Sequence, residues 1–293
     1  MSFNVLSLFD GISCGMVALE RAGIRVERYV AYEIEKNAIE VSKYNYPMIE
    51  HKGDVFKANY KEGEFDLLIG GSPCTHWSIA KAGNNRETTS SGVGWELFMQ
   101  YVRALREVKP KYFLYENNES MSDAIKEEIT KQLGVEPIMI DSADFSAQQR
   151  KRYYWTNIPV EFNYKKSDLV LEDVLYPHDY KIRDFTKYKE SVKWNKDETI
   201  CRYDTSGKGY YSQASRCRKT SIKSNTLTAS GNDKNNIWIK DYQCRVLHPI
   251  EAERLQTLPD NYTVCLKSKV KRNEVCGNGW TVDVIVHILK GIK

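Results

Sequence analysis

The chain has 293 residues, which fits one large α/β domain or a main domain with a small second one. Its 41% hydrophobic and 28% charged residues exclude disordered, collagenous and coiled-coil proteins. No basic leader opens the chain and no apolar run nears the roughly 20 residues of a membrane helix, so we expect neither secretion nor membrane insertion. The seven Cys residues form no CxxC pair, which favours a reducing cytoplasm and a protein without bound metal.

The net charge is only +4, but its distribution is uneven. Residues 181–224 carry twelve Lys/Arg against five Asp/Glu, an excess of +7, which leaves −3 for the other 249 residues. Cations interleaved with aromatic rings suit contact with phosphates and bases, although a solvated surface can have the same composition. The aromatic residues of this segment are Phe185, Tyr188, Trp194, Tyr203, Tyr210 and Tyr211.

Short apolar runs that end in turn residues alternate with amphipathic stretches, as in βαβ units. This pattern predicts an α/β fold class with a doubly wound, mostly parallel sheet. We expect strands at residues 5–9, 29–32, 65–69, 112–115 and 137–140, and an antiparallel edge strand at 153–156. We expect helices at residues 15–22, 36–44, 96–108, 124–132, 249–256 and 282–289.

The alternation stops near residue 162, where the composition becomes polar and basic, and it resumes near residue 249. We therefore expect a main domain made of residues 1–162 and 244–293, and a small irregular domain at residues 163–243. No internal repeat or low-complexity linker is present.

Three features of the first half predict a site for a nucleoside cofactor. The first predicted strand leads into Phe9-Asp10-Gly11-Ile12-Ser13-Cys14-Gly15, where glycines allow a tight turn and close approach of a ligand to the backbone. Glu33 follows the second strand, where a doubly wound fold uses a carboxylate to hold ribose hydroxyls, and Asp54 follows at another predicted strand end. Each acid has a simpler interpretation as a helix cap or a surface charge. The loop is not GxGxxG and no GxxxxGK[ST] occurs, which argues against nicotinamide and triphosphate ligands.

Further polar groups follow later strands. Gly70-Gly71-Ser72-Pro73-Cys74 places a thiol just after a buried strand, and Glu116-Asn117-Asn118 ends another. Gln148-Gln149-Arg150-Lys151-Arg152 adds two guanidinium groups. These three segments predict that a thiol, a carboxyl and guanidinium groups converge at one edge of the sheet.

Taken in this order, the motifs resemble those of the cytosine-C5 DNA methyltransferase family. Residues 245–251, 254–256 and 277–282 look like its last two motifs, so the resemblance spans nearly the whole chain. The length resembles compact bacteriophage and bacterial members, whereas residues 137–159 are similar to the catalytic domain of animal de novo DNA methyltransferases. Two departures stand out: Asn118 replaces the usual Val, and Thr75-His76-Trp77 replaces a Gln-rich stretch.

The resemblance implies a chemistry for four side chains. Cys74 as thiolate attacks C6 of a flipped-out cytosine while Glu116 holds N3 and the exocyclic amine. Carbon 5 then takes the methyl group of S-adenosylmethionine, which leaves S-adenosylhomocysteine as product. Arg150 and Arg152 would lower the pKa of the thiol and orient phosphate or base, with structural salt bridges as the simpler alternative. The base that removes the C5 proton is not identified; bound water is a candidate.

The resemblance also assigns two sets of binding residues. The cofactor set is Phe9, Asp10, Gly11, Ile12, Ser13, Gly15, Glu33, Ile34, Asp54, Val55, Ser72, Pro73, Asn278, Trp280 and Thr281. The DNA-binding set is Ser78, Arg86, Arg202, Lys208, Arg216, Arg218 and Lys219. Residues 78–94 would form a lid, and residues 163–243 a target-recognition region.

Double-stranded DNA is the expected partner, without metal or membrane. We expect a monomer in the cytoplasm of a bacterium or of a phage-infected cell, and a cognate restriction endonuclease is a candidate partner. A tRNA cytosine methyltransferase would use the same thiol and acid. A catalytically silent nucleic-acid-binding module is a further alternative, but such a module would not need both Cys74 and Glu116.

Overall fold

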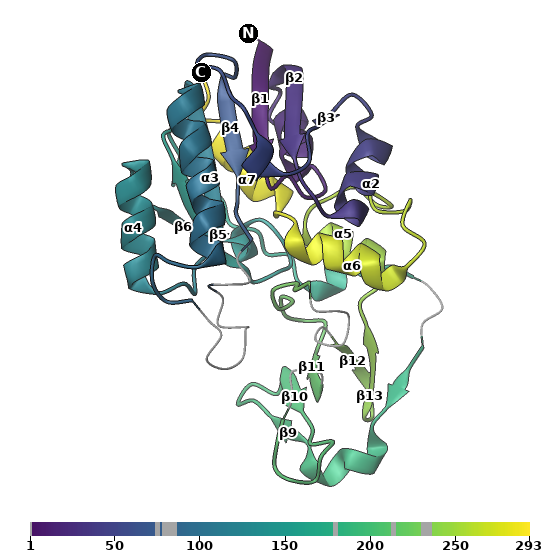
Figure 1. Ribbon diagram of the computed structural model, residues 1–293. Coiled ribbons are helices and arrows are strands. Elements are labelled where there is room, and N and C mark those ends of the chain that lie inside the picture. The colour runs from purple at the N-terminus through teal and green to yellow at the C-terminus, as the bar shows by residue number, and fades with distance from the viewer. Residues whose placement is uncertain (1, 74–76, 78–86, 178–180, 212–214, 230–235) are drawn as a thin grey trace. The chain divides into compact units, whose positions relative to one another are not determined.

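The computed structural model of the chain describes residues 2–73, 77, 87–177, 181–211, 215–229 and 236–293. The chain divides into two compact units (Figure 1). The first comprises residues 1–141, 151–164 and 284–293, and the second comprises residues 142–150 and 165–283.

The first unit is built on a seven-stranded sheet of order β3-β2-β1-β4-β5-β7-β6, in which every neighbouring pair is parallel except those that involve β7. Central strands such as β1 are apolar on both faces, which is typical of a covered parallel sheet. The strands are β1 (Ser2–Leu8), β2 (Arg25–Tyr32), β3 (Glu50–His51), β4 (Leu67–Gly70), β5 (Tyr112–Asn118), β6 (Ile138–Asp141) and β7 (Lys151–Thr156).

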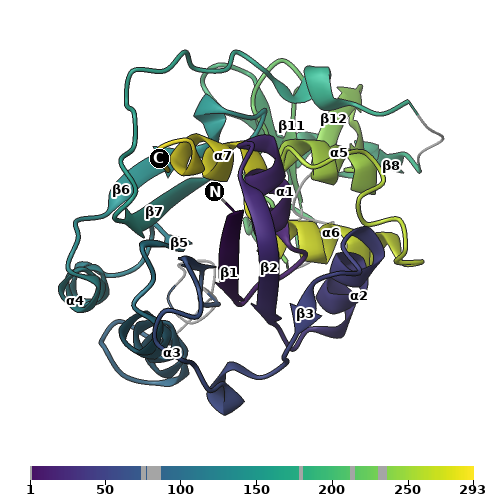
Figure 2. The same cartoon turned by 90° about the horizontal axis from the view of Figure 1, so that it is seen from above.

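Helices cover both faces of this sheet. Figure 2 shows α1 and α7 on one face and α3 and α4 on the other. The doubly wound, mostly parallel α/β fold expected from the alternating pattern is therefore confirmed. The helices that connect the strands are α1 (Cys14–Arg21), α2 (Lys36–Asn45), α3 (Val93–Val108) and α4 (Asp123–Leu133), and α7 (Val282–Leu289) lies near the end of the chain.

The prediction of an edge strand at residues 153–156 was wrong in one respect. Strand β7 is antiparallel as expected, but it lies between β5 and β6, so β6 forms the edge. Pairing on both sides explains why Tyr154 and Trp155 are buried. The sequence pattern could not reveal this order, because it shows which residues form a strand but not which strands lie on either side of it.

Parallel pairing places the ends of four strands in one row. Leu8 pairs with Tyr32 on one side and with Gly70 on the other, and Gly70 pairs with Tyr115. A side chain at Gly70 would bring its Cβ within 2.6 Å of the Leu8 carbonyl oxygen, so glycine is required where these strands approach. The loops that follow the row therefore leave the sheet at the same edge.

An aromatic cluster packs beneath this edge. The ring of Tyr115 lies 4.8 Å from that of Tyr101, 5.2 Å from that of Phe98 and 5.8 Å from that of Trp155, measured between centroids. Tyr101 and Phe98 come from the apolar face of α3, and all four side chains are buried. Packing against α3 and β7 thus fixes the end of β5.

The second unit contains a six-stranded sheet of order β8-β13-β12-β11-β10-β9, with a small core of Phe185, Cys201, Tyr203, Cys217 and Cys244. Helix α5 (Pro249–Leu255) matches the prediction, whereas α6 (Lys269–Asn278) was not expected because its sequence is mostly polar. The strands are β8 (Arg183–Asp184), β9 (Lys193–Trp194), β10 (Ile200–Arg202), β11 (Arg216–Arg218), β12 (Asn236–Lys240) and β13 (Gln243–Val246).

The two units differ in extent from the predicted domains. Residues 142–150 and 244–283 group with the small sheet rather than with the large one. The assignment of residues 163–243 to target recognition concerns function and stays a prediction. None of the helices in the described part of the chain has the length and apolarity needed to span a bilayer.

Candidate active site

The loop after β1 is braced by a buried carboxylate. Asp10 accepts hydrogen bonds from the hydroxyls of Ser7 (2.6 Å), Ser13 (2.5 Å) and Tyr29 (2.7 Å). Burial raises the pKa of Asp10, and the three hydroxyls partly oppose that rise. The Asp10 side chain therefore shapes the loop from within.

Backbone geometry in this loop is unusual. Phe9, Gly11 and Ser13 have φ values of 58°, 60° and 59°, in the left-handed region that side chains rarely adopt. Ser13 precedes α1, but its hydroxyl binds Asp10 and does not cap the helix. The start of α1 therefore lacks the usual side-chain cap at the place where we predicted a ligand. Ile12 and Gly15 of the predicted set are buried here.

Glu33 links the loops that follow β1 and β2. Its carboxylate accepts from the backbone N–H groups of Gly11 (2.8 Å), Ile34 (2.7 Å) and Glu35 (2.8 Å). The neighbouring Ile34 side chain is 73% exposed, which is high for an isoleucine. A carboxylate held by backbone donors beside an exposed apolar side chain fits a ligand with both hydroxyls and a flat ring.

Asp54 begins a short 3-10 helix, η1 (Val55–Lys57), by accepting from the backbone N–H of Phe56 at 3.0 Å. Val55 is buried, whereas Phe56 is 49% exposed. Val55 was predicted to contact the cofactor and Phe56 was not, because only the turn of η1 shows which of the two apolar neighbours faces outward.

The segment that leads to Cys74 is held by β5. The hydroxyls of Ser72 and Tyr115 are 2.7 Å apart, and the Asn117 amide donates to the Ser72 carbonyl oxygen (3.1 Å) and to the Tyr115 hydroxyl (3.0 Å). Ser72, Tyr115 and Asn117 are all buried, and burial raises the pKa of Tyr115. Tyr115 is thus a neutral hydroxyl that fixes the chain just before Pro73.

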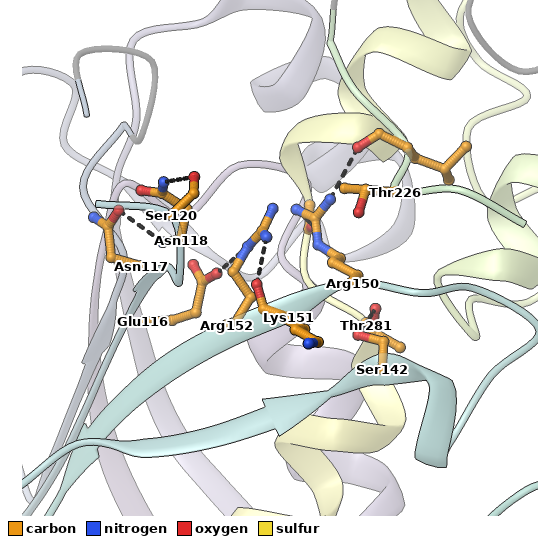
Figure 3. Close-up of polar contacts among 12 residues, drawn as sticks. Glu116, Asn117, Asn118, Ser120, Ser142, Arg150, Lys151, Arg152, Thr226 and Thr281 are labelled. Carbon is orange, nitrogen blue, oxygen red and sulfur yellow. Dashed lines mark hydrogen bonds and ion pairs between the residues drawn. The ribbon is translucent and has the colours of Figure 1, made fainter. Parts of the chain in front are cut away.

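Glu116 forms an ion pair with Arg152. The distance from Arg152 Nε to Glu116 Oε1 is 2.9 Å, and each side chain is 12% exposed (Figure 3). Antiparallel pairing sets Asn118 opposite Arg152 and Glu116 opposite Tyr154, so all four side chains lie on one face of the β5–β7 pair. The ion pair brings together the carboxylate of Glu116 and the guanidinium of Arg152, which were predicted to lie at one edge of the sheet.

In the second unit, Arg150 binds backbone. Its guanidinium donates to the carbonyl oxygens of Leu227 (3.0 Å), Gly277 (3.3 Å) and Gly279 (3.1 Å). These contacts fix the segment around the predicted cofactor residues Asn278, which is exposed, and Trp280, which is partly exposed. The contacts of Arg150 thus give it a structural role, and its effect on the Cys74 thiol stays a prediction.

Thr281, also in the predicted cofactor set, is buried in a hydroxyl network. Ser142 donates to the Thr281 hydroxyl at 2.9 Å, and Thr281 donates to the Gln256 side chain at 2.8 Å (Figure 3). The network joins the segment after β6 to the start of α7.

Three arginines of the predicted DNA-binding set lie on adjacent strands. Arg202 on β10 pairs with Arg216 on β11, and Arg218 follows two residues later; we call these three the arginine ladder. Burial and the neighbouring guanidinium groups lower the pKa of Arg216 and lower that of Arg218 to about 10. None of the three forms an ion pair with a residue that the structure describes. Because facing like charges destabilise a sheet, the ladder favours binding an anion.

Other predicted residues have different positions. Lys219 lies over the ring of Trp194, 5.0 Å from its centroid, and Lys208 is exposed. The predicted nucleophile Cys74 lies outside the described residues, as do Ser78 and Arg86. Across the described ranges, no group of three or more His, Cys, Asp and Glu side chains is arranged to hold a metal ion.

Residues 3–293 match the family model described as C-5 cytosine-specific DNA methylase. The chain belongs to this family. The family inferred from the motifs is thereby confirmed, and the protein is a methyltransferase.

Two curated relatives are also methyltransferases. The chain is 27% identical to the Type II methyltransferase M.FnuDI of Fusobacterium nucleatum, over 99% of this chain and 94% of the relative. It is 40% identical to the Orphan methyltransferase M.SPRI of Bacillus phage SPR, over 39% of this chain and 26% of that protein. Among solved structures, the Dnmt2 methyltransferase of S. pombe aligns with a TM-score of 0.70 and 16% identity, over 99% of this chain and 98% of the other. This last likeness concerns the fold alone.

The Glu116–Arg152 pair should couple strongly in stability. In a double-mutant cycle with Glu116→Gln and Arg152→Met, we expect a coupling energy of about 1.5–3 kcal/mol, because both charges are largely removed from water. Denaturant unfolding measures it. The control is the pair Arg28–Glu50, whose side chains are 36% and 39% exposed and which should couple by less than about 1 kcal/mol. Equal coupling in the two pairs would contradict this account.

Proposed function

We propose that the protein transfers a methyl group from S-adenosylmethionine to C5 of cytosine in duplex DNA. The observation that carries the proposal is the convergence of two contacts on β5: the ion pair that holds Glu116, and the hydrogen bonds that fix Ser72 two residues before Cys74. A positioned carboxyl, and a thiol that closely follows a fixed segment in the sequence, are the groups that this reaction needs.

The residues of the first unit fit the cofactor. Glu33 offers carboxylate oxygens for the ribose hydroxyls, and the exposed side chains of Ile34 and Phe56 offer apolar surface to the adenine ring. Asp54 would accept from the adenine amine. When bound, S-adenosylmethionine supplies an electrophilic methyl on its sulfonium.

Cytosine C5 is a poor nucleophile, so the ring must first be activated. The Cys74 thiolate forms a bond to C6, and the electron pair displaced from the C5–C6 double bond makes C5 nucleophilic. Glu116 holds N3 and the exocyclic amine, and donates a proton or hydrogen bond so that negative charge does not accumulate on the ring. After C5 has taken the methyl, loss of the C5 proton restores the double bond and expels Cys74 as thiolate.

Arg152 positions Glu116 for this task. A guanidinium 2.9 Å from Oε1 restrains the rotamer of the carboxyl. Arg152 therefore acts through Glu116 and is a positioning residue.

The arginine ladder supports a nucleic acid as the substrate. Three cations on neighbouring strands, without a carboxylate partner among the described residues, are suited to the phosphates of a duplex. The target cytosine must leave the stack to reach Cys74, at a cost of a few kcal/mol that phosphate contacts can offset. RNA offers the same cytosine and phosphates, and competition between duplex DNA and RNA decides between them.

Cys74 should form a covalent adduct with DNA that contains 5-fluorocytosine in its target, because fluorine at C5 cannot be lost as a proton and elimination stalls. Bisulfite sequencing of DNA from cells that express the chain first identifies the target. Mass spectrometry then locates the adduct. Cys74→Ser should abolish it, while Cys265→Ser, at a partly exposed cysteine of the second unit, should not. An adduct that persists in Cys74→Ser would refute the assignment.

Glu33→Ala should weaken S-adenosylmethionine binding by about 1–3 kcal/mol, because the ligand hydroxyls and the Gly11 amide both lose an acceptor. Titration calorimetry measures the change. Glu40→Ala, which removes an exposed acid from α2, serves as the control and should leave affinity unchanged. If the two variants bind equally well, Glu33 only braces the loops.

Replacing Arg202, Arg216 and Arg218 by Gln should weaken DNA binding and reduce its salt slope by about one unit per lost phosphate contact. The free protein should keep or gain thermal stability, because facing like charges are removed. Lys240→Gln, at the exposed end of β12, is the control. An unchanged salt slope in the triple variant would show that the ladder does not contact phosphates.

A further inference from the structure

Asn118 at the end of β5 holds a buried polar atom without a partner. The side chain is 3% exposed, and its amide nitrogen donates to Ser120 Oγ at 2.8 Å. Its carbonyl oxygen, Oδ1, is buried and has no hydrogen-bond partner among the residues that the structure describes. A buried polar atom without a hydrogen-bond partner destabilises the free protein. Beside a candidate active site, a bound ligand that supplies the missing hydrogen bond would explain such an atom.

The orientation of the amide supports an acceptor at this position. In this orientation the amide nitrogen has Ser120 as its partner, and the atom left for a ligand is the acceptor Oδ1. The group that completes the site should therefore be a donor.

Strand register places this acceptor beside Glu116, the residue proposed to hold the base. Asn118 lies directly opposite Arg152, and it shares one face of the β5–β7 pair with Glu116, two residues earlier. Figure 3 shows Glu116 and Asn118 on β5 and Arg152 on β7. A cytosine held by Glu116 therefore lies next to Asn118.

The base that Glu116 binds has one donor to spare. The exocyclic amine of cytosine carries two N–H groups, and a carboxyl that spans N3 and the amine accepts only one of them. Building on the proposed function, we infer that Asn118 Oδ1 accepts the second. Uracil and thymine present an oxygen at this position, which would face two acceptors, so Asn118 helps to select cytosine.

Removing the donor from the base tests the contact. Duplexes carry the mapped target with either cytosine or 2-pyrimidinone, which lacks the exocyclic amine, at the target position. Binding is measured with S-adenosylhomocysteine and in Cys74→Ala, which keeps the complex reversible. We expect Asn118→Val to weaken binding of the cytosine duplex about five- to tenfold and that of the 2-pyrimidinone duplex less than about twofold.

A merely structural role would give a different result. Equal weakening on both duplexes, or none on either, would overturn the inference. Asn118→Val should also keep or raise the melting temperature, since it removes an unsatisfied buried atom. Asn118→Ala, which carries no β-branch, repeats the comparison if the valine variant does not fold.

Methyl transfer by the wild-type chain to the cytosine duplex separates this inference from the function on which it rests. If the wild-type chain transfers the methyl group but Asn118→Val weakens binding of both duplexes equally, only the role of Asn118 is overturned. Absence of transfer overturns the proposed function, and the role of Asn118 with it.

Discussion

Parallel pairing aligns one residue from each of four strands in a single row across the sheet: Tyr32, Leu8, Gly70 and Tyr115. Glu33, Ser72 and Glu116 each follow this row by one or two residues. Glu33, Ser72 and Glu116 consequently meet at one edge although they are far apart in the sequence. A change of register in any of these pairs would move a functional loop by one pleat and turn its side chains to the opposite face.

Tyr115 connects the packing of the core with the geometry of the site. Its ring belongs to the aromatic cluster, and its hydroxyl binds Ser72. The adjacent residue, Glu116, faces the other side of β5 and meets Arg152 on β7. Stability and site geometry therefore share one strand, and substitutions in the cluster should disturb the segment before Cys74 as well as the core.

Much of the fold follows from local patterns, because buried parallel strands are apolar runs and their helices are amphipathic. The loops at Asp10, Glu33 and Ser72 were found for the same reason. Other features depend on long-range pairing: the interior position of β7, the backbone contacts of Arg150 and the unpartnered oxygen of Asn118. Helix α6 was missed because its polar sequence has few apolar positions to mark a buried face.

Release of tritium from duplex DNA labelled at C5 of cytosine tests the central step most directly, because in the proposed mechanism the C5 hydrogen is lost after Cys74 adds to C6 and C5 takes the methyl group. The account predicts one tritium released per methyl group transferred. It further predicts a loss of at least about 100-fold in rate for Arg152→Met, in which Glu116 is no longer held, with cofactor binding retained. Release at the wild-type rate by Arg152→Met, or no release by the wild-type chain, would contradict it.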